Sequence, residues 1–247
     1  MQIPRKITPD HLKDTVVEIR FDSAIPLDLL AGTALTLLSP LGFIYTPAPN
    51  NNISLGFAQN QQISIGLNGP NGSGFFVKDD SIRIQFISNV IAFNCVIDKY
   101  VGWSIYSENI RAVLKIFVEK GLIKSFNRIS IRYISEFENV EILKNIKGEI
   151  NIIDTGLGLK DSILRLTKDV ENIKTFVTLT NSTKKIIPTK NQILDVSFID
   201  INVFETLPLN CQIEIFEEKL EKVHMLQKEV FFSLISENFL ESLNPEY

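Results

Sequence analysis

The fold class is decided by residues Tyr100 to Glu138, which read YVGWSIYSENIRAVLKIFVEKGLIKSFNRISIRYISEFE. The segment opens on an aromatic–glycine corner, residues 100–103. A helix is predicted next, because apolar side chains recur at spacings of four, three and four at Tyr106, Ile110, Val113 and Phe117. Gly121 suits the left-handed position that ends such a helix. The alternating residues 128–135 then predict a strand, so the passage indicates an α+β protein.

The same order of elements is predicted on both sides of this passage. Before it come a strand at 15–21, a helix at 26–38 and a meander of short strands between 43 and 98. After it we expect a strand at 128–137, a short helical piece at 140–146, strands at 149–153, 162–167, 175–179 and 193–204, and a long helix over 211–243.

This order predicts two tandem β-α-β(4)-α units with antiparallel sheets and long packing helices. The expected boundaries are an N-terminal arm at 1–13, a first unit at 14–124 and a second unit at 125–247. Such a plan is similar to TATA-binding-protein-like or helix-grip folds. A fold-level likeness of this kind implies no function.

Composition favours a globular protein and excludes several classes. Hydrophobic residues make up 45% of the 247 residues and charged residues 22%, with a net charge of −4. An acidic chain argues against bulk nucleic-acid binding, which needs a dense Lys/Arg surface. The N-terminus lacks the apolar core of a signal peptide, and no run approaches the roughly 20 apolar residues of a membrane span.

Two cysteines, Cys95 and Cys211, sit among apolar residues. We interpret them as buried free thiols, which suit a reducing compartment. The expected location is therefore the cytoplasm.

The chain resembles a sporadically distributed bacterial family of uncharacterised proteins of about this length. The resemblance covers nearly the whole chain and rests on four motifs: Val17-Glu18-Ile19-Arg20-Phe21, Tyr100-Val101-Gly102-Trp103, residues 128–135, and Val223-His224-Met225-Leu226 followed by Val230-Phe231-Phe232. Two positions depart from the family pattern, since Val101 replaces a proline and Ser135 replaces an asparagine. The family carries no established activity, and its patchy distribution implies mobile or defence-associated genes.

Few residues have the spacing that catalysis or metal binding requires. Asp154-Thr155-Gly156 looks like the aspartic-protease triplet, but a second copy is missing from the chain, so a strand ending in a turn is the simpler interpretation. The glycine-rich residues 66–74 lack a Gly-Lys-Ser/Thr ending and indicate a hairpin turn. The two histidines, His11 and His224, have no ligand spacing, so we expect no metal and no cofactor, with a structural role for His224.

Four residues are candidates for binding a ligand or partner: Arg20, Tyr100, Trp103 and Arg132. Tyr100 and Trp103 either seat the central helix or anchor a partner. Arg20 and Arg132 occupy corresponding strands. They either hold an anionic group together or are solvated or internally paired, with Asp195 and Asp200 as the expected internal partners.

The last helix carries more apolar surface than one sheet is expected to cover, because its late residues include Phe231, Phe232, Phe239 and Leu240. A homo-oligomer through the C-terminal helix is therefore expected as one mode of association.

The sequence favours a non-enzymatic, cytoplasmic protein-interaction component. Its sharpest form is an accessory, immunity or antitoxin-like partner of a bacterial toxin or defence effector encoded nearby. A small-ligand or nucleotide-binding module, with its site between sheet and helix, is the alternative. A hydrolase using Asp154 ranks third.

Overall fold

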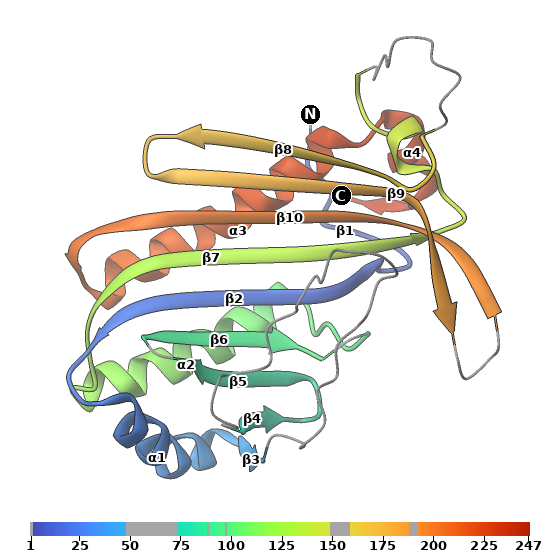
Figure 1. The fold of residues 1–247 in the computed structure, drawn as a ribbon. Coiled ribbons are helices and arrows are strands. Elements are labelled where there is room, and N and C mark those ends of the chain that lie inside the picture. The colour runs from blue at the N-terminus through green and yellow to red at the C-terminus, as the bar shows by residue number, and fades with distance from the viewer. Residues whose placement is uncertain (1, 48–73, 88, 97, 149–158, 188–191) are drawn as a thin grey trace. The chain divides into compact units, whose positions relative to one another are not determined.

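The computed structural model describes residues 2–47, 74–87, 89–96, 98–148, 159–187 and 192–247. It confirms an α+β protein with a large antiparallel sheet and few helices (Figure 1). Nine strands follow the order β3-β4-β5-β6-β2-β7-β10-β9-β8. The chain divides into two compact units, which are described separately. Unit 1 comprises Met1–Thr15, Ile131–Glu205 and Glu221–Tyr247, and unit 2 comprises Val16–Ser130 and Thr206–Leu220.

Four elements contribute residues to both units. They are β2 (Leu12–Ser23), β7 (Ile123–Glu138), β10 (Gln192–Cys211) and α3 (Ile213–Leu234). The compact units are thus interleaved along the chain, whereas the sequence predicts a boundary between residues 124 and 125. That tandem boundary stays a prediction.

Unit 2 contains most of the first half of the chain. Its remaining elements are α1 (Leu27–Leu38), a 3-10 turn η1 (Ser39–Leu41), β3 (Ile44–Thr46), β4 (Phe75–Lys78), β5 (Ile82–Ile87), β6 (Val90–Cys95) and α2 (Trp103–Glu119). In β2, Val17, Ile19 and Phe21 are fully buried, while Arg20 between them is exposed. This is the alternation expected of a strand with one face in the core.

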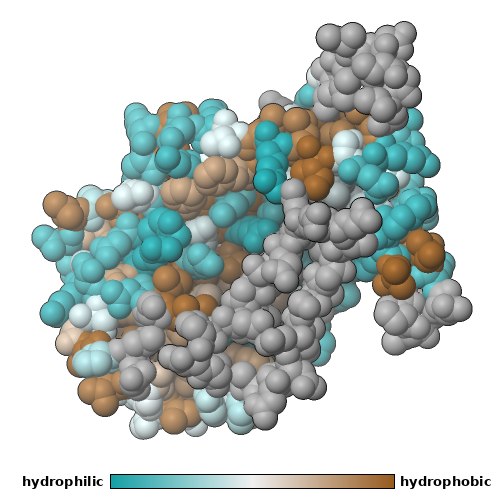
Figure 2. All heavy atoms as spheres, in the orientation of Figure 1, coloured by the Kyte–Doolittle hydropathy of each residue, from teal (hydrophilic) through white to brown (hydrophobic). Residues whose placement is uncertain are grey.

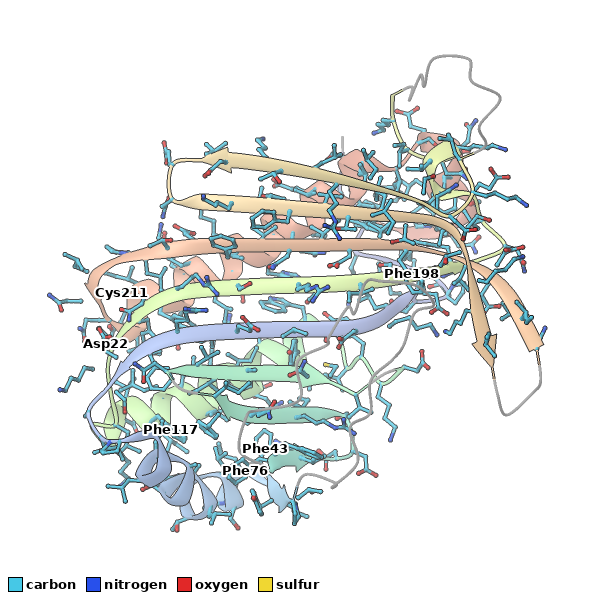
Figure 3. All side chains as sticks on the ribbon, in the orientation of Figure 1. Asp22, Phe43, Phe76, Phe117, Phe198 and Cys211 are labelled. Carbon is cyan, nitrogen blue, oxygen red and sulfur yellow. The ribbon has the colours of Figure 1, made fainter. Side chains whose placement is uncertain are left out.

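The core of unit 2 lies between its strands and α2. All four apolar residues of the predicted helix stripe are fully buried. Phe117 of α2 stacks on Phe86 of β5 at a centroid distance of 5.6 Å, and Phe86 meets Phe76 of β4 edge-on at 5.9 Å. Phe76 and Phe117 are labelled in Figure 3. The helix ends as predicted, because Gly121 takes φ +66° directly after it.

Unit 1 carries the second half of the sheet. Its further strands are β8 (Ser162–Val170) and β9 (Ile173–Ile187), and both β8–β9 and β9–β10 pair antiparallel. From α3, Val223, Gln227 and Phe231 are buried. Leu226 and Gln227 both suit the apolar spacing of this helix, and the structure buries Gln227 more deeply.

The predicted helix over 211–243 is wrong as a single helix. Helix α3 ends at Leu234, and a short α4 (Glu237–Ser242) follows. The break is stabilised by backbone hydrogen bonds to residues 145 and 147, since Ser236 N–H donates to Asn145 and Lys147 N–H donates to Leu234. The hydroxyl of Ser236 then caps α4 by accepting the N–H of Phe239.

The predicted arm at 1–13 is partly ordered structure. Within it, β1 (Lys6–Ile7) pairs with β11 (Pro245–Glu246), and β2 begins at Leu12. Strand pairing between residues so far apart in sequence is invisible to local periodicity. The piece predicted at 140–146 is a 3-10 turn, η2 (Ile142–Lys144).

Several predictions fall outside the described residues. They are most of the glycine-rich segment 66–74, the strand at 149–153 and the Asp154 triplet. Cys95 and Cys211 are buried thiols that form no disulfide in the part of the chain that the structure describes, as predicted. Within the described helices, none is long and apolar enough to cross a membrane.

Candidate functional site

The sheet of unit 1 has one face packed in the core and one face that carries polar residues. On β10, Ile199, Ile201 and Val203 are almost completely buried, whereas Asp200 and Asn202 between them are half-buried. Successive side chains of a strand point to opposite faces. We call the face that bears Asp200 the front face; in Figure 1, helix α3 passes behind β10 on the other side.

Strand pairing assembles a surface of threonines and aromatic rings on the front face. Thr178 lies opposite Asp200, and Phe176 lies opposite Asn202. Phe176 stacks on Phe204 at a centroid distance of 5.8 Å and remains 39% exposed. Figure 2 shows hydrophilic and hydrophobic residues intermixed over β8, β9 and β10. The front face therefore offers aromatic area together with hydrogen-bonding groups.

Arg132 of β7 and Asp200 of β10 form the strongest ion pair on this face. The guanidinium donates through Nε to Oδ1 at 2.9 Å and through Nη2 to Oδ2 at 2.6 Å. Both side chains are mostly buried. Two parallel hydrogen bonds fix the orientation of both groups. The sequence interpretation of Arg132 as an internally paired arginine with Asp200 as its partner is confirmed, whereas Asp195 pairs with Lys184.

Asp14 of β2 brings a second carboxylate to this pair. Its side chain is 7% exposed, and Oδ2 has no hydrogen-bond partner among the described residues. The pKa of Asp14 is raised to about 6, mainly by burial; the charge of Arg132 and the hydrogen bond from the Thr15 backbone lower it, and the charge of Asp200 adds a smaller upward effect. An ionised carboxylate held in this way is poorly compensated.

A second ion pair lies further along the same face. Lys185 of β9 donates to both carboxylate oxygens of Glu136 at 2.7 Å. Glu136 shares its face of β7 with Arg132, because the two are an even number of residues apart. With Asp14 and Asp200, these residues form what we call the front-face charge cluster. Its three carboxylates and two cations leave one uncompensated negative charge when all are ionised.

A polar cluster in unit 2 shows what a compensated carboxylate looks like. Asp22, labelled in Figure 3, accepts from Asn127 Nδ2 at 2.9 Å and from Ser125 Oγ at 2.8 Å. The hydrogen bond from Asn127 is the larger cause that lowers the pKa of Asp22, and the one from Ser125 is the next. Asp22 is satisfied locally, whereas Oδ2 of Asp14 has no donor among the described residues.

The remaining candidates lie in unit 2. Tyr100 and Trp103 both contact the buried ring of Tyr106 edge-on, at centroid distances of 6.3 and 6.2 Å. The hydroxyl of Tyr106 donates to the carbonyl of Phe93 at 2.6 Å. This geometry supports the interpretation of the corner as a seat for the central helix. Gly102 makes the turn possible with φ +83°.

Arg20 lies on an exposed position of β2 beside Arg128. The pKa of Arg128 is lowered mainly by its burial and next by the charge of Arg20. Arg20 belongs to unit 2 and Arg132 to unit 1.

The predicted structural role of His224 agrees with its environment. The ring is buried on α3 at a centroid distance of 6.2 Å from Tyr133, and burial lowers the pKa of His224 to about 4. The ring of His11 donates from Nδ1 to the backbone carbonyl of Glu136 at 3.2 Å and lies 4.7 Å from the Phe137 ring. Among the described residues, no group of three His, Cys, Asp or Glu side chains has the arrangement of a metal site.

Sequence reasoning found Arg132 and Asp200 but missed Asp14. The residue stands just before the predicted strand 15–21, and a charged side chain at the end of a strand is ordinarily expected to be solvated. Its position under Arg132 depends on strand pairing within unit 1. Nothing in the local pattern indicates that burial.

Comparison with known proteins adds no relative. No protein-family model, no curated protein and no solved structure matches this chain. The class that the fold defines is an α+β protein with a large antiparallel sheet, and the geometry of the front face carries the functional argument.

Proposed function

We propose that the protein is a non-enzymatic interaction component that binds another protein through the front face of unit 1. A Lys or Arg side chain of the partner donates to Asp14 beside the Arg132–Asp200 pair. Phe176 and Phe204 supply the neighbouring apolar contact. Aromatic residues beside oriented charges are typical of energetically dominant positions in interfaces.

The unsatisfied Oδ2 of Asp14 is the observation that carries this proposal. A buried acceptor without a donor costs free energy, and a charged donor from outside removes that cost. The fixed Arg132–Asp200 pair holds the surroundings rigid, so little ordering is needed on binding. The net charge of −4 also favours a basic partner.

The narrower proposal is an accessory, immunity or antitoxin-like partner of a toxin or defence effector. The resemblance to a patchily distributed bacterial family motivates this choice, because such genes often travel with their partners. The gene products encoded next to this chain are therefore the first candidates.

The test is co-purification of the tagged full chain with each neighbouring gene product, followed by titration calorimetry. We expect one stoichiometric complex with the wild-type chain. Asp14→Asn is expected to weaken it about tenfold or more, because a hydrogen bond between charged groups is replaced by a neutral one. Affinity should also fall with added salt.

Glu241→Gln is the matched control, since it removes an exposed carboxylate of α4. It should bind within about twofold of wild type, well below the tenfold step that 1.4 kcal/mol represents. The proposal is wrong if folded Asp14→Asn binds as tightly as wild type, or if no neighbouring product forms a complex.

A small-ligand or nucleotide-binding module is the second candidate function. The same Asp14 oxygen suits a primary amine, and the Arg132 guanidinium suits an anionic group. A thermal-shift screen of small amines, anions and nucleotides tests this alternative, because a ligand of the folded state raises Tm. A rise that disappears in Asp14→Asn would favour the module over a protein partner.

A hydrolase using Asp154 remains the third candidate. Asp154 lies outside the described residues, so the front face neither includes nor replaces it. An Asp154→Asn chain with unchanged behaviour in the native host would remove this candidate.

A duplicated architecture accompanies the functional proposal. The strands that open the two predicted units, β2 and β7, are neighbours in the sheet order. In each half, the strand before the long helix, β6 or β10, lies next to that opening strand. This order supports tandem β-α-β(4)-α units of a TATA-binding-protein-like or helix-grip type.

A further inference from the structure

Strand β8 stands at the end of the sheet order. It spans nine residues and pairs with β9 on one side, and no other described strand pairs with its outer edge. Such an edge presents backbone N–H and C=O groups to any strand that can lie beside it. Leu166 and Val170 on β8 are 44% and 50% exposed, so apolar area accompanies the free edge.

The residues of β8 restrict how two copies could pair. Two antiparallel β8 strands related by a two-fold axis place one residue opposite itself, and facing residues point to the same side of the sheet. If the two-fold axis passes through Arg165, Lys168 or Asp169, two like charges lie directly opposite each other, which is destabilising. A centre at Leu166 leaves Asp169 facing Ile163 and Lys168 facing Leu164.

A centre at Thr167 gives a complementary arrangement. Arg165 of each copy then faces Asp169 of the other, which forms two ion pairs across the interface. On the opposite face, Leu164 meets Val170 and Leu166 meets Lys168, each twice, so the two ion pairs are what distinguish this register from the one centred on Leu166. Asp169 contacts Lys174 within its own chain at 2.9 Å, but both side chains are about half exposed, and a pair of this kind contributes little.

We infer that two copies of the chain associate through β8 in the register that places Thr167 opposite Thr167. The strand that pairs with this edge is thus the β8 strand of a second copy, because the charges of the two strands are complementary in this register. This mode of association differs from the one that the sequence suggested. The late apolar residues of the C-terminal helices, Phe231, Phe232, Phe239 and Leu240, are buried within the single chain.

Charge reversal tests the register. Light scattering over a concentration series should show wild type approaching twice the chain mass of 28.0 kDa. Arg165→Asp and Asp169→Arg should each weaken dimerisation about tenfold, because two attractive pairs become repulsive. The double variant exchanges the charges and should return to within about threefold of wild type, as expected for directly coupled residues.

A cysteine at the proposed axis provides an independent measurement. Thr167→Cys places two thiols opposite each other, close enough for a disulfide between copies. Mild oxidation should give a covalent dimer. Thr178→Cys, in the middle of β9, is the control and should stay monomeric under the same conditions. The two native cysteines are buried and give little background.

A strictly monomeric wild type at high concentration would overturn the inference. So would a dimer that the double variant fails to restore, or a Thr178→Cys chain that crosslinks as readily as Thr167→Cys. The binding proposal for Asp14 is judged separately, because Asp14 is not on β8 and partner titration does not need the dimer.

Discussion

At the scale of single residues, Asp14 connects stability with binding. Its ionised form lies under a bidentate ion pair that already satisfies the available guanidinium. The carboxylate of Asp14 is therefore only partly compensated by the described residues. Residues of this kind are candidates for functional sites, because perturbed pKa values concentrate where chemistry or recognition occurs.

Asp14→Asn is expected to stabilise the protein at neutral pH. The pKa of about 6 in the folded chain lies above the ordinary value of 3.8 for an aspartate, so the ionised native state is penalised above pH 6. The gain at pH 7 is on the order of 3 kcal/mol at most. It should shrink as pH falls from 6 to 4, because native Asp14 then binds a proton.

Urea unfolding of wild type and Asp14→Asn at pH 7 and pH 4 measures this difference. Glu241→Gln is again the control, with no comparable gain. A variant that is less stable than wild type at pH 7 would show that Asp14 is compensated in the folded chain.

At the scale of elements, the end of the chain shows how one polar residue divides a helix. The apolar spacing continues past Leu234, yet Ser236 starts a new helix with its own cap. The break lets Phe239 of α4 pack edge-on against Phe137 of β7 at a centroid distance of 5.3 Å. A continuous helix would carry Phe239 further along the α3 axis.

Ser236→Ala is expected to destabilise the protein by about 1 kcal/mol, because it removes the acceptor for the Phe239 N–H. Ser233→Ala is the matched control, since the exposed Ser233 hydroxyl donates only to the carbonyl of Val230 one turn earlier. Its effect should stay within about 0.5 kcal/mol. Equal losses for both serines in urea unfolding would contradict a capping role for Ser236.

At the scale of the whole molecule, two buried titratable groups have opposite effects on how stability depends on pH. Between pH 6.5 and 4 the unfolded chain protonates His224 while the folded chain does not, so this residue destabilises the protein as pH falls. Asp14 acts in the other direction between pH 6 and 3.8. Each effect amounts to about 3 kcal/mol, and the two nearly cancel.

His224→Gln is expected to reveal this balance. Without the buried imidazole, the free energy of unfolding should increase as pH falls from 6 to 4, because the contribution of Asp14 is no longer offset. Wild type should show a shallower dependence over the same range, measured by the unfolding midpoint in urea. If the unfolding midpoint of His224→Gln changes with pH in parallel with that of wild type, His224 does not offset the contribution of Asp14.

Pairing through β8 would also extend the front face. Arg165 faces Thr178 across the β8–β9 pair, so it lies on the same side as Asp200. A two-fold axis at Thr167, perpendicular to the sheet, keeps both front faces on one side. Two binding faces that point the same way would allow bivalent attachment to a partner that is itself repeated.

The sequence by itself determined most of the elements, but not the break between α3 and α4. Period-two and period-3.6 patterns found the strands, the stripe on α2 and the end at Gly121, because these depend on neighbours a few residues apart. Only the tertiary structure decided the burial of Asp14, the pairing of β1 with β11 and the place of β8 at the end of the described sheet order. Each depends on which distant strands become neighbours, and no local spacing encodes that choice.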